Sequence, residues 1–239
     1  MTLYKKIQNS KRKLFAVLID PDKVEEQNFA KIIEYGNQKM FDFIFVGGSI
    51  VNNSTDKLVK RIKSLLDVEV VLFPGNPSQI SNSADAILFL SLLSGRNPEY
   101  LIGHHVSSAK ALKNSNLEVI STGYILIQGS KVSSTEYITN TKPIPGENYE
   151  IAVSTAIAGE LLGMKIIYLE GGSGAEISIN EKMISEVKNN ISIPLIVGGG
   201  IKTKYDFETV LKAGADLIVV GNAIEENPDL IKEFGQIIR

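Results

Sequence analysis

The sequence predicts an α/β fold in which eight parallel strands close into a (β/α)8 TIM barrel. Short runs of branched apolar residues recur eight times along the 239 residues, with helical patterns in most of the gaps. Each run is continuously apolar rather than alternating, as expected of parallel strands covered on both faces. This number of alternating elements favours a barrel over a doubly wound open sheet, which shares the alternation.

The elements follow one another without a break in composition. The predicted strands span residues 14–20, 41–48, 69–73, 86–90, 117–126, 165–172, 193–200 and 215–222. Helices are predicted from apolar spacing around residues 29–33 and over 54–66, 151–163, 179–190, 204–215 and 227–239. A helix is also compatible with 97–110. No linker or internal repeat divides the chain, so residues 1–239 are predicted to form a single domain.

Two of the gaps depart from the alternation. The segment "PGNPSQISNSAD" contains Pro74 and Pro77 and is too short and broken for a full helix. The third covering helix is therefore predicted to be missing or vestigial, which leaves one flank of the barrel open. The connection after residue 126 is long, and we expect it to fold back as a hairpin around Gly129 and Ser130.

Composition excludes several classes of function. The chain has 25 basic and 27 acidic residues, a net charge of −2 and no large basic cluster, so nucleic-acid binding is not expected. The absence of cysteine excludes thiolate metal sites and cysteine nucleophiles. The N-terminus has no apolar signal core, and no apolar run reaches the roughly 18 residues of a membrane span. The sequence predicts a cytoplasmic protein.

Three loops at the ends of consecutive strands are rich in glycine. They are "GGSG" at 171–174, Gly198-Gly199-Gly200 and Gly221-Asn222. The carboxyl ends of parallel barrel strands form the active face, and adjacent glycines let backbone N–H groups approach an anion. Any one pair is more simply a tight turn. Together they predict a phosphate site enclosed from three sides.

Oxygen-bearing side chains also follow predicted strands. Glu170 ends an apolar strand, and since a packed core rejects an unpaired charge, we expect Glu170 to face the pocket and bind substrate hydroxyls. Asp20 and Asp22 lie in "IDPDK" after the first strand, and Ser49 follows the second. Carboxylate and hydroxyl oxygens suit Mg²⁺, although Asp-Pro-Asp is also common in turns.

The motifs "LIDPDK", "FVGGS", "YLEGGSG", "VGGGI" and "VVGN", in this order, resemble the geranylgeranylglyceryl phosphate synthases and the PcrB-like prenyltransferases. The resemblance runs from about Phe15 to about Ile224. It implies a modified barrel without the third helix and transfer of a prenyl group from geranylgeranyl diphosphate to the 3-hydroxyl of sn-glycerol 1-phosphate. A longer donor such as heptaprenyl diphosphate remains an alternative. Homo-oligomers, as dimers or hexamers, are also implied.

The resemblance further implies roles for individual residues. Glycerol 1-phosphate would be held by Tyr168, Leu169, Glu170, Gly171, Gly172, Ser173, Gly174, Gly199, Gly200, Gly221 and Asn222. Asp20, preferred to Asp22, and Ser49 would hold Mg²⁺. Glu170 and Tyr168 would be catalytic, and Tyr124 would wall a prenyl trough on the open flank. Leu18 occupies the position at which another branch carries a phosphate-contacting lysine, so that contact is absent or supplied elsewhere.

Two other classes of function remain as alternatives. A phosphate-binding isomerase or aldolase would use the same loops, but Lys165 precedes its strand and so lies at the wrong end for a Schiff base. A non-catalytic phosphate-binding barrel would need neither Asp20 nor Glu170. His104 and His105 are interpreted as structural or surface residues, since adjacent helical positions do not share a face.

Overall fold

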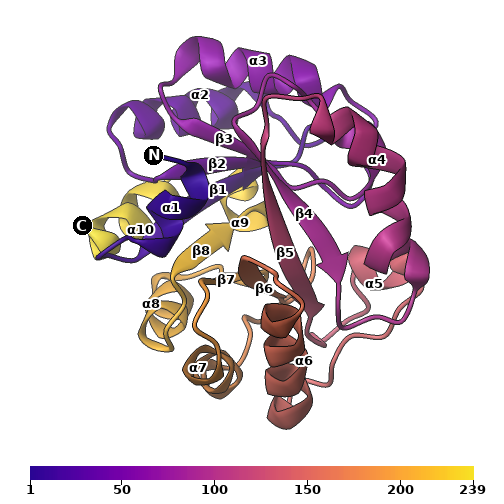
Figure 1. The fold of residues 1–239 in the computed structure, drawn as a ribbon. Coiled ribbons are helices and arrows are strands. Elements are labelled where there is room, and N and C mark those ends of the chain that lie inside the picture. The colour runs from indigo at the N-terminus through magenta and orange to yellow at the C-terminus, as the bar shows by residue number, and fades with distance from the viewer.

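The computed structural model describes residues 1–239 and confirms the barrel. All eight strands pair in parallel in sequence order, and β1 closes the sheet on β8 (Figure 1). Each observed strand falls on a predicted one, within a few residues at the ends. The strands are β1 (Leu14–Ile19), β2 (Phe43–Val46), β3 (Glu69–Leu72), β4 (Ala86–Leu92), β5 (Glu118–Leu126), β6 (Ile166–Glu170), β7 (Leu195–Gly198) and β8 (Leu217–Val220).

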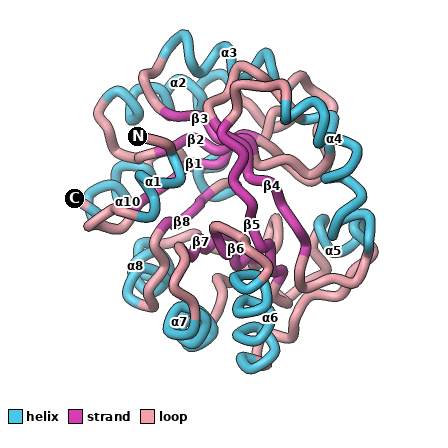
Figure 2. The backbone as a smooth tube through the Cα atoms, viewed as in Figure 1, coloured by secondary structure: helices cyan, strands magenta, loops and turns pink.

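Helices surround the strands on the outside, joined by loops that Figure 2 draws in pink. The helices are α1 (Leu3–Gln8), α2 (Glu26–Asn37), α3 (Thr55–Leu65), α4 (His104–Lys113), α5 (Ser134–Thr139), α6 (Tyr149–Leu161), α7 (Glu181–Asn190), α8 (Lys204–Lys212), α9 (Asn222–Glu226) and α10 (Leu230–Ile238). The short helices α1, α5 and α9 were not predicted, because segments of five or six residues show too little periodicity. None of the helices combines the length and the hydropathy of a membrane span.

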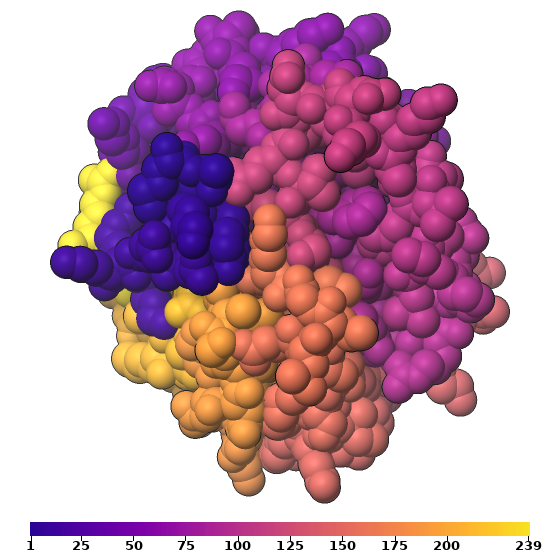
Figure 3. Space-filling model, in the orientation of Figure 1, coloured from indigo at the N-terminus to yellow at the C-terminus, as the bar shows by residue number.

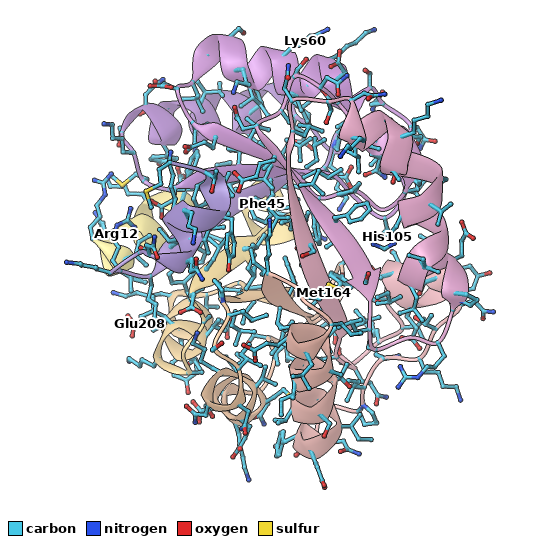
Figure 4. The ribbon with its side chains drawn as sticks, viewed as in Figure 1. Arg12, Phe45, Lys60, His105, Met164 and Glu208 are labelled. Atoms are coloured by element: carbon cyan, nitrogen blue, oxygen red, sulfur yellow. The ribbon has the colours of Figure 1, made fainter.

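Side chains alternate between two apolar layers along each strand. In β6, Ile166 and Tyr168 point into the barrel, whereas Ile167 and Leu169 pack outward against the helices. The outer layer includes an aromatic group in which Phe207 and Phe234 stack with ring centroids 4.6 Å apart. The inner layer includes Phe45, which Figure 4 places at the centre of the barrel.

The N-terminal helix α1 closes the amino-terminal end of the barrel. Leu3 and Ile7 are buried in the inner apolar layer, and the N-terminal residues cover part of the face shown in Figure 3. The Glu118 carboxylate, at the start of β5, accepts hydrogen bonds from the backbone N–H groups of Leu3 at 2.6 Å and Tyr4 at 3.1 Å. These bonds satisfy donors that the first turn of a helix leaves free.

The predicted gap in the helical cover is confirmed. Only a 3₁₀ turn, η1 (Pro77–Gln79), lies between β3 and β4, so that α3 and α4 are the neighbouring helices on this side of the barrel (Figure 1). The predicted hairpin around Gly129 and Ser130 is wrong. After β5 the chain makes a parallel bridge between Ile127 and Ile144 and forms α5 in between.

Replacing Glu118 tests the anchoring of α1. We expect Glu118→Ala to lower the free energy of unfolding by about 1–2 kcal/mol, because two N–H donors lose a charged acceptor. Glu233→Ala is a control, since this exposed carboxylate on α10 makes no side-chain hydrogen bond or ion pair, and should change stability by less than about 0.5 kcal/mol. Urea unfolding measures both variants. Equal stability of the two variants would contradict the anchoring role.

Candidate active site

One continuous cavity opens at the carboxyl ends of the strands and brings most of the predicted site residues together. Leu169 and Gly171 are the two exceptions: Leu169 packs outward, and the Gly171 N–H donates to the Gly198 carbonyl oxygen at 2.9 Å. The cavity is lined by Asp20, Ser49, Tyr124, Tyr168, Glu170, Gly172, Ser173, Gly174, Gly199, Gly200, Gly221 and Asn222.

Glu170 is a buried carboxylate at the last position of β6. The residue is 6% exposed, and its Oε1 accepts a hydrogen bond from the Gly172 N–H at 2.8 Å. Burial raises the pKa of Glu170 to about 7, and the Gly172 N–H opposes the shift in part. A carboxyl group with this pKa changes protonation near neutral pH, which is the property that a general base requires.

Three aromatic rings lie beside this carboxylate. Phe73 stacks on Tyr168 with centroids 5.1 Å apart, and Tyr124 lies 5.5 Å from Tyr168. The Tyr168 hydroxyl is buried near Glu170 but makes no hydrogen bond of normal geometry. Burial, and then the charge of Glu170, raise the pKa of both tyrosines. Both therefore remain protonated, and Tyr168 keeps a free donor at the cavity.

Two glycines at the end of β7 are required by these side chains. A Cβ on Gly198 would overlap the Tyr168 hydroxyl, and one on Gly199 would overlap Glu170 Oε1. Gly199 also has a φ of +86°, which an L side chain rarely adopts. The glycine loop therefore fits closely around the carboxylate, and its backbone lines the cavity.

Asp20 begins a β-turn directly after β1. The Lys23 N–H donates to the Asp20 carbonyl oxygen at 3.0 Å, and the Asp20 Oδ1 accepts the Asp22 N–H at 3.0 Å. The Asp20 carboxylate lies against Gly48, where any Cβ would press on Oδ2. Partial burial raises the pKa of Asp20. Its carboxylate thus faces the loop after β2, next to the cavity.

The two carboxylates of the turn have different partners. Asp22 accepts backbone N–H groups from Asn52 at 2.8 Å and Asn53 at 2.7 Å, which lowers its pKa and fixes the loop after β2. Asp20 accepts one such bond on its side chain. The Ser49 hydroxyl makes one hydrogen bond, with the Thr135 hydroxyl of α5 at 3.3 Å. Asp20 and Ser49 therefore offer free oxygen atoms, whereas the oxygens of Asp22 are occupied.

The oxygen atoms of Asp20 and Ser49 suit a hard cation whose remaining coordination positions are filled by other ligands. No group of three or more His, Cys, Asp or Glu side chains lies close enough to hold a metal ion alone. Mg²⁺ commonly takes one or two protein oxygens and fills its remaining positions with water and substrate phosphates. The set formed by Asp20 and Ser49 fits that pattern.

The same cavity continues as an apolar trough between β4 and α4. The absence of a helix after β3 exposes the outward side chains Ile87 and Phe89 to it, and Ile80 and Leu112 complete its walls. His105 lies edge-on to Phe89 at 4.2 Å, on the side of α4 that faces β4 (Figure 4). Burial lowers the His105 pKa, so the ring is neutral at pH 7.

Sequence reasoning missed several residues of the cavity. Phe73, His104 and His105 line it, and so do Lys23 from the turn after β1 and Glu225 from α9. The two histidines, predicted to be structural or surface residues, both face the trough. The sequence did contain a signal for this position, namely two adjacent polar residues on a possible helix beside the open flank of the barrel. Nothing in the sequence around Glu225 distinguishes it from a surface carboxylate.

The placement of lysines argues against an aldolase. The Lys165 ammonium lies 5.5 Å over the ring of Tyr4, at the end of the barrel that α1 closes. The lysines that line the cavity, Lys23 and Lys202, come from loops. No strand lysine therefore reaches the cavity to form a Schiff base.

A closed parallel barrel with glycine loops after β6, β7 and β8 has the architecture of the phosphate-binding TIM-barrel enzymes. Similarity to distant barrels shows this fold alone: the N-acetylmannosamine-6-phosphate 2-epimerase of Clostridium perfringens is 14% identical, with a TM-score of 0.60. Closer comparisons define the family. The sequence profile of the PcrB family matches residues 6–237, and the chain belongs to that family.

Relatives in this family are similar to this chain over nearly its full length. The geranylgeranylglyceryl phosphate synthase of Chitinophaga pinensis is 53% identical over 95% of this chain and 90% of that protein. A crystal structure of (S)-3-O-geranylgeranylglyceryl phosphate synthase from Thermoplasma acidophilum in complex with its substrate sn-glycerol-1-phosphate is 33% identical, with a TM-score of 0.89 over 100% of this chain and 97% of that one. The predicted family and the prediction of an enzyme are confirmed.

The burial of Glu170 predicts a pH-dependent stability. Its pKa rises from an ordinary value of 4.5 to about 7 on folding, so the unfolded chain binds fewer protons between these values and the wild type loses stability as pH rises through that range. Glu170→Gln removes the loss. We expect the variant to gain up to about 3 kcal/mol over the wild type between pH 4.5 and pH 8. Urea unfolding at several pH values tests this, and parallel profiles would contradict it.

Proposed function

We propose that this chain transfers a geranylgeranyl group from its diphosphate to the 3-hydroxyl of sn-glycerol 1-phosphate, giving geranylgeranylglyceryl phosphate. The observation that carries the proposal is a single cavity that joins glycine loops and a buried carboxylate to an apolar trough. Its polar end suits a small phosphorylated acceptor, and its apolar end suits a long hydrocarbon. The bound substrate of the Thermoplasma acidophilum relative supports the identity of the acceptor.

The acceptor phosphate would bind the backbone N–H groups of the glycine loops. Gly199, Gly200, Gly221 and Asn222 line one side of the cavity and Ser173 lines another. Close approach of main chain to a phosphate needs residues without Cβ, which these loops supply. The glycerol hydroxyls would then face the buried carboxylate at the end of β6. Of the predicted set, Leu169 and Gly171 do not line the cavity, so neither is proposed to contact the acceptor.

The prenyl chain of the donor would lie in the trough between β4 and α4. Its walls are apolar, and Tyr124 stands where the trough meets the polar end. The donor diphosphate would then lie near the loops after β1 and β2. Geranylgeranyl diphosphate is the donor favoured by the relatives' names, and heptaprenyl diphosphate is the alternative within the family.

Mg²⁺ is the proposed cofactor, held by Asp20 and Ser49. When bound beside the diphosphate, this ion neutralises charge on the leaving group. The protein supplies one half-buried carboxylate and one hydroxyl with free lone pairs. Asp22 is left out, because it already accepts hydrogen bonds from two backbone N–H groups.

The residues of the chain account for the transfer itself. Glu170 accepts the proton of the 3-hydroxyl while that oxygen forms a bond to C1 of the prenyl group. The bond between C1 and the diphosphate oxygen breaks, and diphosphate leaves with the electron pair. Tyr168, whose hydroxyl has no other partner, donates to a glycerol oxygen and holds the acceptor in position.

Assembly and location complete the proposal. We expect a homo-oligomer, a dimer or a hexamer, in the cytoplasm. Large apolar side chains exposed on α6, Ile151 and Leu161, and at Leu162 directly after it, agree with an oligomer.

Replacement of the two carboxylates tests their roles. We expect Glu170→Gln and Asp20→Asn each to lower kcat by about 100-fold or more, through loss of the proton acceptor and of a metal ligand. In the wild type, kcat/KM should fall as pH drops below about 7, since Glu170 then becomes protonated. Glu150→Gln and Asp67→Asn, both exposed and outside the cavity, are matched controls. Wild-type turnover in either site variant would refute its role.

The reaction is tested by a prenyl-transfer assay with Mg²⁺, labelled sn-glycerol 1-phosphate and donors of several chain lengths. Glycerol 3-phosphate serves as the control acceptor. We expect an ether product with glycerol 1-phosphate, greatest with geranylgeranyl diphosphate. A longer preferred donor would select the heptaprenyl alternative. Binding of glycerol 1-phosphate without product from any donor would favour a non-catalytic barrel.

A further inference from the structure

Lys23 ends the turn after β1 and places its ammonium group at the mouth of the cavity. Its Nζ lies 3.4 Å from Asn222 Oδ1, 3.5 Å from Glu225 Oε2 and 3.8 Å from Asp20 Oδ2. Asn222 belongs to the loop proposed for the acceptor phosphate, and Asp20 faces the position proposed for the donor diphosphate. Lys23 therefore contacts both proposed anion sites.

Positive charge is scarce in this cavity. Two lysines line it, Lys23 and Lys202, and no arginine does. Leu18, whose side chain lies against Gly221, supplies no charge at the same loop. The cavity is lined by the carboxylates of Asp20, Glu170, Glu225 and Glu226. Two phosphorylated substrates bound side by side would repel these groups and each other, so a cation between them favours binding of both.

We propose that Lys23 is a substrate-binding residue whose ammonium lies between the acceptor phosphate and the donor diphosphate and donates hydrogen bonds to both. The inference rests on the proposed function. An ammonium has three donors on a flexible stem and serves as a point charge for phosphate. The Lys23 side chain is 43% exposed, so it has room to turn toward an incoming anion.

Glu225 is the positioning residue for this lysine. Its side chain is 10% exposed, and its Oε1 accepts the Asp20 N–H at 2.9 Å. Its Oε2 is buried without a hydrogen-bond partner, and the Lys23 ammonium, 3.5 Å away, is the positive charge beside it. A buried carboxylate without a partner favours a nearby cation, so Glu225 holds the ammonium at the mouth of the cavity.

A purely structural ion pair is the competing explanation, and the distances argue against it. Lys188 and Asp216, which support the outside of the barrel, form an ion pair at 2.6 Å. The contacts of Lys23 with its two carboxylates are about an ångström longer. Lys23 is thus shared among three acceptors at long range and keeps donor capacity for a substrate.

The test compares Lys23→Gln with Lys23→Arg in the full chain. We expect Lys23→Gln to raise KM for both substrates by about tenfold, the effect of losing one charge-assisted hydrogen bond. Lys23→Arg should recover most of the affinity, and both variants should remain folded. Lys31→Gln is the matched control, since Lys31 pairs with Asp229 outside the cavity and should keep wild-type KM values.

Each other outcome overturns the proposal. KM values within twofold of wild type for both substrates would leave Lys23 a structural residue, and so would an equal loss in the Gln and Arg variants. A rise in KM for one substrate alone would refute the position between two anions. If the wild type forms no ether product, the proposed function fails, yet Lys23 is still tested. Weaker binding of glycerol 1-phosphate and of inorganic pyrophosphate by Lys23→Gln, measured by calorimetry, would support it, and unchanged binding would refute it.

Discussion

The connection between β3 and β4 determines the shape of the site. Residues 73–85 hold one 3₁₀ turn where the other strand-to-strand connections carry a helix. In a complete barrel, a helix between β3 and β4 would bury the outward faces of these strands. Because that helix is absent, the outer side chains of β4 face a trough bounded by α4. The barrel remains closed, since every strand keeps both parallel neighbours. The absence of this helix therefore removes one packed interface and leaves an apolar space that a hydrocarbon can fill.

The polar end of the cavity depends on a second constraint, the burial of Glu170. Keeping a carboxyl group in an apolar barrel opposes its ionisation, and the structure offers it one backbone donor. The glycines at the end of β7 let the main chain close around it, and the rings of Phe73 and Tyr168 stack beside it. Desolvation of a titratable group at this point is of the kind that active sites carry and the surrounding fold compensates.

Sequence analysis predicted the features that depend on local residue chemistry. The eight strands were found because branched apolar runs have few alternative structures in a covered parallel sheet, and the missing helix because Pro74 and Pro77 forbid it. The glycine loops and Glu170 stood out since such residues are unusual at strand ends. The predicted hairpin after β5 was wrong: the chain forms α5 there, and the Thr135 hydroxyl of α5 contacts Ser49, a partner distant in the sequence.

Residues that act through tertiary contacts were harder to predict. His105 and Phe73 reach the cavity only because of how α4 and β3 are placed, and no local pattern records this. The different roles of Asp20 and Asp22 likewise depend on the loop after β2, which occupies one carboxylate and leaves the other free. Periodicity in the sequence predicts helices and strands, whereas the role of a residue depends on its contacts with segments that are distant in the sequence.

A crystal structure with sn-glycerol 1-phosphate and an unreactive thiolo analogue of geranylgeranyl diphosphate would test the central claim most directly. The account predicts the acceptor phosphate on the glycine loops after β7 and β8, the 3-hydroxyl within hydrogen-bonding distance of Glu170, and the prenyl chain between β4 and α4. A prenyl chain bound outside that trough, or a phosphate away from the glycine loops, would contradict it.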